Sequence, residues 1–251
     1  MIWEKFKDLV HPSWEHVIRP FVESEDCDEL YSYLKQRGRE RRKIAPLSTL
    51  TYRCFLETPL YELRAVLMGM SPYHTMLGNI MVADGLLMGC SITGKLQPSL
   101  QKFYEGLENE LYNGLNLEYE KTPDVSYLAK QGVLMLNASL TVEINKAGSH
   151  LKIWEPFIKH IFENAIGPSR VPVIFLGKDA ARYKRWMAPL TWSFITSHPA
   201  SAAYNHTEWD TEGVFTKVNT LLKEEGKESI YWLKVEGDNL EIAKEVDDLP
   251  F

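Results

Sequence analysis

Polar side chains stand directly after three apolar runs of the sequence, where buried strands are expected to end. Ser71 and His74 follow the first run, Asn137 closes the second, and His198 follows a later one. A carboxamide such as that of Asn137 donates and accepts hydrogen bonds at once, so it can read the edge of a base, and hydroxyl and imidazole groups supply further hydrogen bonds. These residues are therefore candidates for one ligand site.

Each of these residues also has a purely structural interpretation. Pro72 fixes the backbone angle φ and the Ser71 hydroxyl can bond nearby backbone, so this segment is equally consistent with a simple turn. Asn137 could satisfy buried backbone groups, and a lone His at a strand end is more often a structural residue than a catalytic one. Only their joint position favours a site.

The elements that must position these residues are strands alternating with helices. Short apolar runs predict buried strands at residues 64–70, 132–137, 171–176 and 192–196. Helices are expected from Ser24 or Asp26 through Lys43, from Pro98 through Leu111, and over residues 154–165, 178–186 and 211–225. The alternation predicts a parallel sheet, and ligands bind beyond the carboxyl ends of the strands in such sheets.

Composition limits the class of protein. The 251 residues suffice for one α/β domain, so we expect a single domain over residues 1–251. The formal net charge of −6 argues against a protein that coats nucleic acid nonspecifically, and the basic run from Arg37 to Lys43 is expected to be a solvated face. Three widely spaced cysteines indicate neither a disulfide framework nor a zinc site. No signal peptide or membrane span is recognisable, which favours a cytoplasmic protein.

Several ordered segments carry a more specific signal. They read GMSPYH at residues 69–74, PSL at 98–100, KQGVLMLNA at 130–138, SHPASA at 197–202 and FTKVN at 215–219. In this order they resemble the G-Q-D-P-Y-H, P-P-S-L, K-Q-G-V-L-L-L-N-A, H-P-S-P-L and F-S-K-T-N segments of the family 1 uracil-DNA glycosylases. The match at 130–138 is the most specific, and the resemblance covers roughly residues 12 to 235.

The resemblance implies a fold and a set of roles. It implies a three-layer α/β/α domain with a central four-stranded parallel sheet, hydrolysis of the N-glycosidic bond of uracil in DNA, no metal, no cofactor and a monomer. Asn137 would bind the uracil edge, and Tyr73 would exclude thymine by filling the space beside C5. His198 would hydrogen-bond uracil O2 as the base leaves, assisted by backbone amides around Met70 and Ser71.

The chain also departs from the family it resembles. Ser71 stands where the family has the carboxylate that orients water and stabilises the developing positive sugar, and loss of a general base typically costs about 10²–10⁴-fold in rate. Met88 stands where a Phe stacks on uracil, and the loop from His74 to Gly85 looks longer. Ala202 replaces a Leu that enters the duplex, and Ala200 replaces a serine that grips a phosphate. The residues expected at the DNA are Pro98, Ser99, Lys178, Ala200, Ser201 and Ala202.

These matches and departures leave two functional hypotheses. The first is a uracil-DNA glycosylase of weakened or altered activity, acting on single- or double-stranded DNA that contains uracil. Its catalytic residues would be Ser71 and His198, and its substrate-binding residues Met70, Tyr73, Met88 and Asn137. The second is a catalytically inactive relative that binds DNA or a protein partner. A third and weaker hypothesis is that the changed loop accommodates a modified base.

Overall fold

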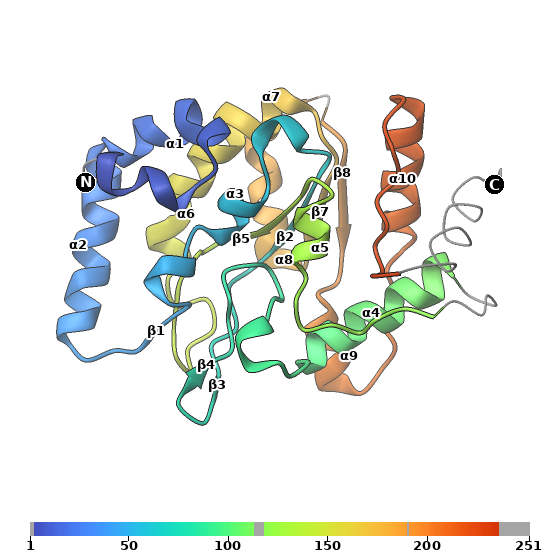
Figure 1. Ribbon diagram of the computed structural model, residues 1–251, viewed down its shortest axis with the longest axis horizontal. Coiled ribbons are helices and arrows are strands. Elements are labelled where there is room, and N and C mark those ends of the chain that lie inside the picture. The colour runs from blue at the N-terminus through green and yellow to red at the C-terminus, as the bar shows by residue number, and fades with distance from the viewer. Residues whose placement is uncertain (1–2, 113–117, 190, 236–251) are drawn as a thin grey trace.

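The computed structural model describes residues 3–112, 118–189 and 191–235 (Figure 1). Its centre is a four-stranded sheet in the order β5-β2-β7-β8, in which all neighbouring strands are parallel. The strands are β2 (Ala65–Gly69), β5 (Val133–Asn137), β7 (Val173–Leu176) and β8 (Ser193–Thr196). The four strands expected from the apolar runs are thereby confirmed.

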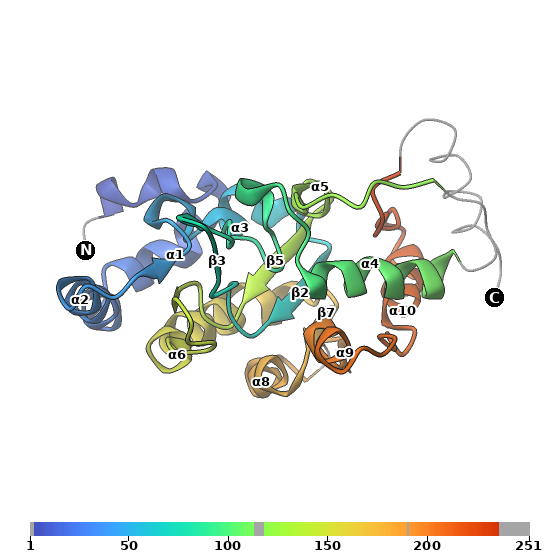
Figure 2. The same ribbon diagram turned by 90° about the horizontal axis from the view of Figure 1, so that it is seen from below.

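The strands form a buried layer between helices. Every residue of β2, β5 and β7 is buried, as is typical of a parallel sheet covered on both faces. Figure 2 shows α3 (Arg53–Glu57) and α5 (Ser126–Ala129) on one side of the central strands, and α6 (Leu151–Ile161) and α8 (Lys178–Ala181) on the other. The architecture has the three α/β/α layers that the family resemblance implied.

The strand order creates a topological switch at β2. The chain passes from β2 to β5 on one side and then crosses to β7 on the other side of β2. At such a switch point the loops that follow neighbouring strands run in opposite directions, which opens a crevice at the carboxyl edge of the sheet. Gly69 at the end of β2 is paired with Asn137 at the end of β5, so two of the segments with candidate residues leave the sheet side by side.

The expected helices are present, with some ends displaced. Helix α2 (Glu25–Arg39) begins after Ser24, whose hydroxyl accepts a hydrogen bond from the Cys27 amide, and acidic residues occupy its first turn. It ends at Arg39 rather than at Lys43, because the chain becomes left-handed at Arg41 (φ 59°). Helix α4 (Pro98–Leu111) carries Pro at its first position, which suits a residue without an amide hydrogen.

The other expected helices differ more from their predicted ranges. Helix α6 begins before residue 154 and continues as a π-helix over Phe162–Ile166. The segment predicted as one helix over 178–186 divides into α8 and a 3-10 helix, Arg182–Trp186. Helix α10 (Val214–Glu224) begins later than predicted because Gly213 before it adopts a left-handed conformation, with φ 66°.

Some elements were not predicted. These include helices α1 (Glu15–Val22), α5, α7 (Gly167–Ser169) and α9 (Pro199–Asn205), the hairpin of β3 (Met76–Leu77) and β4 (Ile80–Met81), and the antiparallel pair of β1 (Ile44–Ala45) and β6 (Val142–Glu143). The strands among them have two residues each, too few for a periodic signal. Shorter 3-10 helices lie at residues 3–5, 7–9, 12–14, 48–50, 60–62 and 91–93. Within the described ranges, no helix is long and apolar enough to cross a membrane.

Candidate active site

A cavity of about 720 Å³ opens at the carboxyl edge of the sheet. Its walls come from the segments that follow β2, β7 and β8, and from loops at residues 87–88 and 147. Most of the predicted site residues line it, namely Met70, Ser71, Tyr73, Met88, Ser99, Lys178, His198, Ala200 and Ser201. The fold therefore brings together residues that are far apart in the sequence.

The side chains of Leu87 and Asn137 pack closely against Gly69 at the end of β2. The Ala138 amide donates to the Gly69 carbonyl oxygen at 2.9 Å, which joins the ends of β2 and β5. A Cβ atom on Gly69 would lie 2.3 Å from Leu87 Cδ1 and 3.4 Å from Asn137 Oδ1. Because real side chains do not approach within 2.3 Å, only glycine at this position lets Leu87 and Asn137 pack against the strand end.

Asn137 is buried with an unused acceptor. Asn137 is 2% exposed and is not among the residues that line the cavity, but it pairs in the sheet with Gly69, which directly precedes the lining residue Met70. Within the described part of the chain, its Oδ1 atom has no hydrogen-bond partner. An unsatisfied buried polar atom costs roughly 1–3 kcal/mol, so this oxygen is suited to accept a hydrogen bond from a ligand.

Tyr73 forms a fixed wall of the cavity. Its hydroxyl group and the Ser99 hydroxyl group share a hydrogen bond of 2.7 Å. Burial raises the pKa of Tyr73 well above its usual range, so the phenol stays neutral. The same hydrogen bond holds Ser99, a buried residue at the start of α4, in the wall of the cavity. The adjacent Pro98 does not line the cavity.

His198 occupies the N-cap position of α9, and this position fixes its protonation. The Ala200 amide donates a hydrogen bond of 3.0 Å to His198 Nδ1, so Nδ1 carries no hydrogen. Burial lowers the pKa of His198 from 6.5 to about 4, so the ring is neutral near pH 7. A neutral ring with Nδ1 as the acceptor carries its hydrogen on Nε2. Nε2 is therefore a hydrogen-bond donor available to a ligand.

Ser71 is held by the segment that follows β6. The Gly148 amide donates to Ser71 Oγ at 3.3 Å, and the Asn145 amide donates to the His74 carbonyl oxygen at 2.8 Å. These two bonds clamp the loop of residues 70–74 from one side, and Ala147 between them lines the cavity. His74 also lines the cavity, and its Nδ1 atom is buried without a partner among the described residues.

The loop that carries Met88 is organised by a buried carboxylate. Asp84 is fully buried, accepts hydrogen bonds from the amides of Leu86 and Ser91, and forms an ion pair of 2.8 Å with Arg53. Met88 is 4% exposed with φ at 59°, a left-handed conformation that costs a non-glycine residue roughly 1–2 kcal/mol. No local pattern pointed to this carboxylate, because its partner Arg53 lies 31 residues away along the chain.

The remaining predicted DNA-binding residues divide into two groups. Lys178, Ala200 and Ser201 line the cavity. Ala202 is only 6% exposed and belongs to the core on α9, a helix in contact with α4. The sequence did not single out Glu212, a carboxylate that lines the same cavity, or Asp179 as a site residue. The mouth of the cavity therefore combines cationic and anionic groups.

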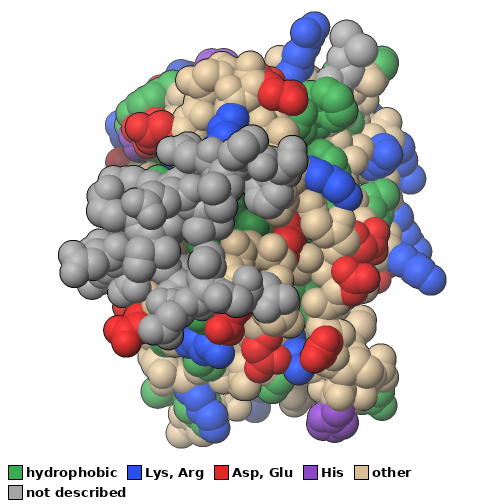
Figure 3. All heavy atoms as spheres, turned by 90° about the vertical axis from the view of Figure 1, so that its right-hand side faces the viewer, with side chains coloured by type: hydrophobic (Ala, Val, Ile, Leu, Met, Phe, Trp, Pro, Cys, Tyr) green, Lys and Arg blue, Asp and Glu red, His purple; other side chains and the backbone are tan. Residues whose placement is uncertain are grey.

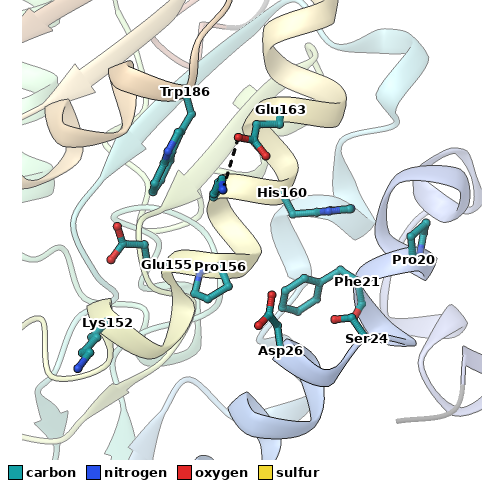
Figure 4. Close-up of a pocket in the computed structure, with 11 residues that line it drawn as sticks. Pro20, Phe21, Ser24, Asp26, Lys152, Glu155, Pro156, His160, Glu163 and Trp186 are labelled. Atoms are coloured by element: carbon teal, nitrogen blue, oxygen red, sulfur yellow. Dashed lines mark hydrogen bonds and ion pairs between the residues drawn. The ribbon is translucent and has the colours of Figure 1, made fainter.

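A second cavity, of about 640 Å³, lies away from the strand ends, between α6 and the segment that joins α1 to α2 (Figure 4). Several of its polar groups already have structural partners. The His160 ring contacts the Val17 carbonyl oxygen at 2.7 Å, and Lys159 pairs with Glu163 at 3.8 Å. Glu155 pairs with Arg185. Because this second cavity contains none of the predicted site residues, the cavity at the sheet edge is the candidate active site.

Comparison with known proteins agrees with this assignment. Residues 57–223 match the family described as the uracil DNA glycosylase superfamily. The chain is 31% identical over 226 residues to a uracil-DNA glycosylase of Wolinella succinogenes, covering 89% of this chain and 94% of that protein. It is 30% identical over 230 residues to one from Acinetobacter baumannii, covering 90% and 93%.

Solved structures show the same fold. The crystal structure of mimivirus uracil-DNA glycosylase superposes with a TM-score of 0.76 at 21% identity, covering 92% of each chain. The wild-type UNG structure from Nitratifractor salsuginis gives a TM-score of 0.58 at 18% identity, covering 93% of this chain and 98% of that one. At these identities the likeness supports the architecture alone.

Proposed function

Because this chain belongs to the uracil DNA glycosylase superfamily, we propose that it hydrolyses the N-glycosidic bond of uracil in DNA, at a rate lowered by Ser71. The observation that carries the proposal is the buried Oδ1 atom of Asn137, which lacks a partner among the described residues. Uracil presents a donor at N3 and an acceptor at O4, and one carboxamide can satisfy both. Cytosine presents the opposite pattern on this edge, so the same amide would discriminate against it.

The proposed reaction places the flipped base in the cavity at the sheet edge. The Nε2–H group of His198 would donate to uracil O2, where negative charge grows as the bond to the sugar breaks. A neutral donor suits this role, because it stabilises the anionic base without giving up its proton. Backbone amides around Met70 and Ser71 would assist, and the Tyr73 ring would exclude a methyl group at C5.

Water activation is the weak step of this proposal. A Ser71 hydroxyl can orient a water molecule through a hydrogen bond, but it carries no charge to stabilise the developing positive sugar. We therefore expect excision to be slower by about 10²–10⁴-fold than with a carboxylate at this position. Met88 also offers no aromatic face for stacking on the base.

A second candidate function is binding without catalysis. It is favoured by the burial of Ala202 at 6% exposure, because a buried alanine on α9 cannot enter a duplex to hold a flipped base out. In that case the partner would be DNA or a protein. One structural neighbour with a TM-score of 0.79, a variant of mimivirus UNG, is in complex with UGI.

Uracil release under single-turnover conditions tests the proposal. Excess wild-type protein would be incubated with single-stranded and duplex oligonucleotides that contain one uracil, beside Asn137→Ala and His198→Ala. We expect slow release by the wild type and a loss of about 10²–10³-fold in His198→Ala, the magnitude for removal of one donor from an anion-stabilising site. No release by the wild type after long incubation would leave the binding function.

We also expect the protein to act as a monomer, which its sedimentation velocity at several concentrations would test. A DNA substrate implies an intracellular place of action.

A further inference from the structure

The end of α2 and the turn that follows it carry four cations that have no carboxylate partner among the described residues. Arg39, Arg41, Arg42 and Lys43 are exposed and form no ion pair with any described residue. We call residues 39–43 the basic turn. Arg37 just before it differs, because it pairs with Glu143 at 2.5 Å and also with Glu40. The sequence predicted one solvated face for this run, whereas the fold separates a paired Arg37 from a free basic turn.

One residue of the basic turn occupies a position that favours glycine. Arg41 has φ at 59°, and its amide donates to the Gly38 carbonyl oxygen at 2.9 Å, which closes the end of α2. Glycine is the residue best suited to such a helix end, and another L-residue costs roughly 1–2 kcal/mol there. An arginine at this position therefore keeps a positive charge on the turn at a cost in stability.

The basic turn lies close to the candidate active site. The Ile144 amide donates to the Lys43 carbonyl oxygen at 2.9 Å. The same segment, residues 143–148, also bonds to the loop that lines the cavity. The Asn145 amide donates to the His74 carbonyl oxygen, and the Gly148 amide donates to Ser71 Oγ. A single strip of backbone thus separates the basic turn from the loop that lines the cavity.

A hairpin with an apolar tip stands beside the basic turn. Leu77 and Ile80 face one another in the β3–β4 pair, and they are 44% and 49% exposed. Lys43 Nζ lies 3.9 Å from the sulfur of Met76 at the start of this hairpin. Figure 1 shows the hairpin and α9 projecting from the same lower edge of the molecule, the edge at which the strands end. The hairpin begins two residues after His74, which lines the cavity, so it connects the loop at the cavity with the neighbourhood of the basic turn.

Several cations on the opposite side of the molecule pair with carboxylates. Lys102 pairs with Glu105 at 2.8 Å, Lys121 with Glu108 at 4.0 Å, and Lys234 with Glu120. Figure 3 shows acidic and basic side chains intermixed on that face. Four exposed cations without an ion pair to any described residue lie within the five residues 39–43, and such a local concentration of positive charge in a chain with a net charge of −6 fits an anionic partner.

We propose that the basic turn and the hairpin tip form an accessory DNA-binding surface for the strand that flanks the base in the cavity. The cations of the basic turn would contact phosphates, and Leu77 and Ile80 would contact the apolar faces of a sugar or base. The choice of DNA as the partner rests on the proposed function. This surface would compensate for the buried Ala202 by holding the DNA from the other side of the cavity.

The charges are tested with a matched pair of double variants of the full chain. Arg41→Gly with Arg42→Gln removes two charges from the basic turn, and the glycine fits φ at 59°. The control, Arg170→Gly with Lys130→Gln, also removes two exposed charges and also replaces a left-handed arginine, with φ at 57°. Arg170 and Lys130 precede β7 and β5, so they lie at the opposite, amino edge of the sheet.

Binding to a uracil-free duplex would be measured by fluorescence anisotropy over a range of salt concentrations. For each phosphate contact that is lost, the slope of log K against log salt should shrink by about 0.9, and hence by up to about 1.8 in the basic-turn variant. The control variant should keep the wild-type slope. Equal slopes in all three proteins would overturn the inference.

The hairpin is tested by Leu77→Ser, with the exposed Tyr61→Ser at the amino edge as its control. We expect Leu77→Ser to weaken duplex binding several-fold at fixed salt with the salt slope unchanged, and Tyr61→Ser to have no effect. A uracil-release assay on the same proteins separates the two proposals. If uracil is released normally and all variants bind the duplex as the wild type does, only the accessory surface is refuted. If no uracil is released but the basic-turn and hairpin variants alone bind the duplex more weakly, only the glycosylase activity is refuted.

Discussion

Acidification offers a quantitative test of how His198 is placed in the site. The pKa of His198 is lowered by burial to about 4, from an ordinary value of 6.5. Between these two pH values the unfolded chain binds more protons than the folded one, so stability rises with pH across this window. The stability associated with the neutral ring is complete above pH 6.5 and is lost progressively as the pH falls toward 4.

The size of the effect follows from the same two values. At 1.36 kcal/mol per pKa unit, the difference between 6.5 and about 4 corresponds to roughly 3 kcal/mol, as an upper limit for a ring that is partly exposed. Other groups also titrate in this range, so a reference protein is needed. His198→Asn is a suitable one, because asparagine does not titrate and is a favoured N-cap residue that can still accept from the Ala200 amide.

The assay is urea unfolding of both proteins at a series of pH values from 7 down to 4. We expect the wild type to lose up to roughly 3 kcal/mol more unfolding free energy than His198→Asn over this range. Above pH 6.5 the difference between the two proteins should be constant. A difference that varies by less than about 0.5 kcal/mol over the whole range would show that the ring is not buried as a neutral group, and would refute the assignment of Nε2 as the donor.

Three further outcomes are expected. Ser71→Asp should raise single-turnover uracil release by about 10²–10⁴-fold, because it supplies a carboxylate for water activation, while the uncharged Ser71→Asn should not; equal rates in both variants would contradict this account. Gly69→Ala should lower the free energy of unfolding by about 1–3 kcal/mol in urea titrations, because the new Cβ would overlap the Leu87 side chain. Asp84→Ala should cost about 3–5 kcal/mol in the same titration, because it leaves Arg53 without its buried partner, and a loss below about 1 kcal/mol would argue against that ion pair.

Much of the fold is readable from local pattern. The strands β2, β5 and β7 coincide with apolar runs, because a strand buried on both faces needs apolar residues at every position, and the run at the partly exposed edge strand β8 marked that strand as well. The starts of α2 and α4 were predicted from Ser24 and Pro98, since capping chemistry depends on residues within one helical turn. The β3–β4 hairpin and α9 were not predicted, because short elements carry too little periodic signal.

The sequence by itself determined which segments reach the carboxyl edge, and it named Ser71, Asn137 and His198 as candidates there. Only the tertiary structure decided the state of these groups. The neutral form of the His198 ring depends on burial, and the open acceptor of Asn137 on what surrounds it. Whether Arg37 or Arg41 keeps a free charge depends on where Glu143 lies, 106 residues along the chain from Arg37. Burial and ion pairing depend on residues that are distant in sequence, and a local sequence pattern does not show which distant residues become neighbours in the fold.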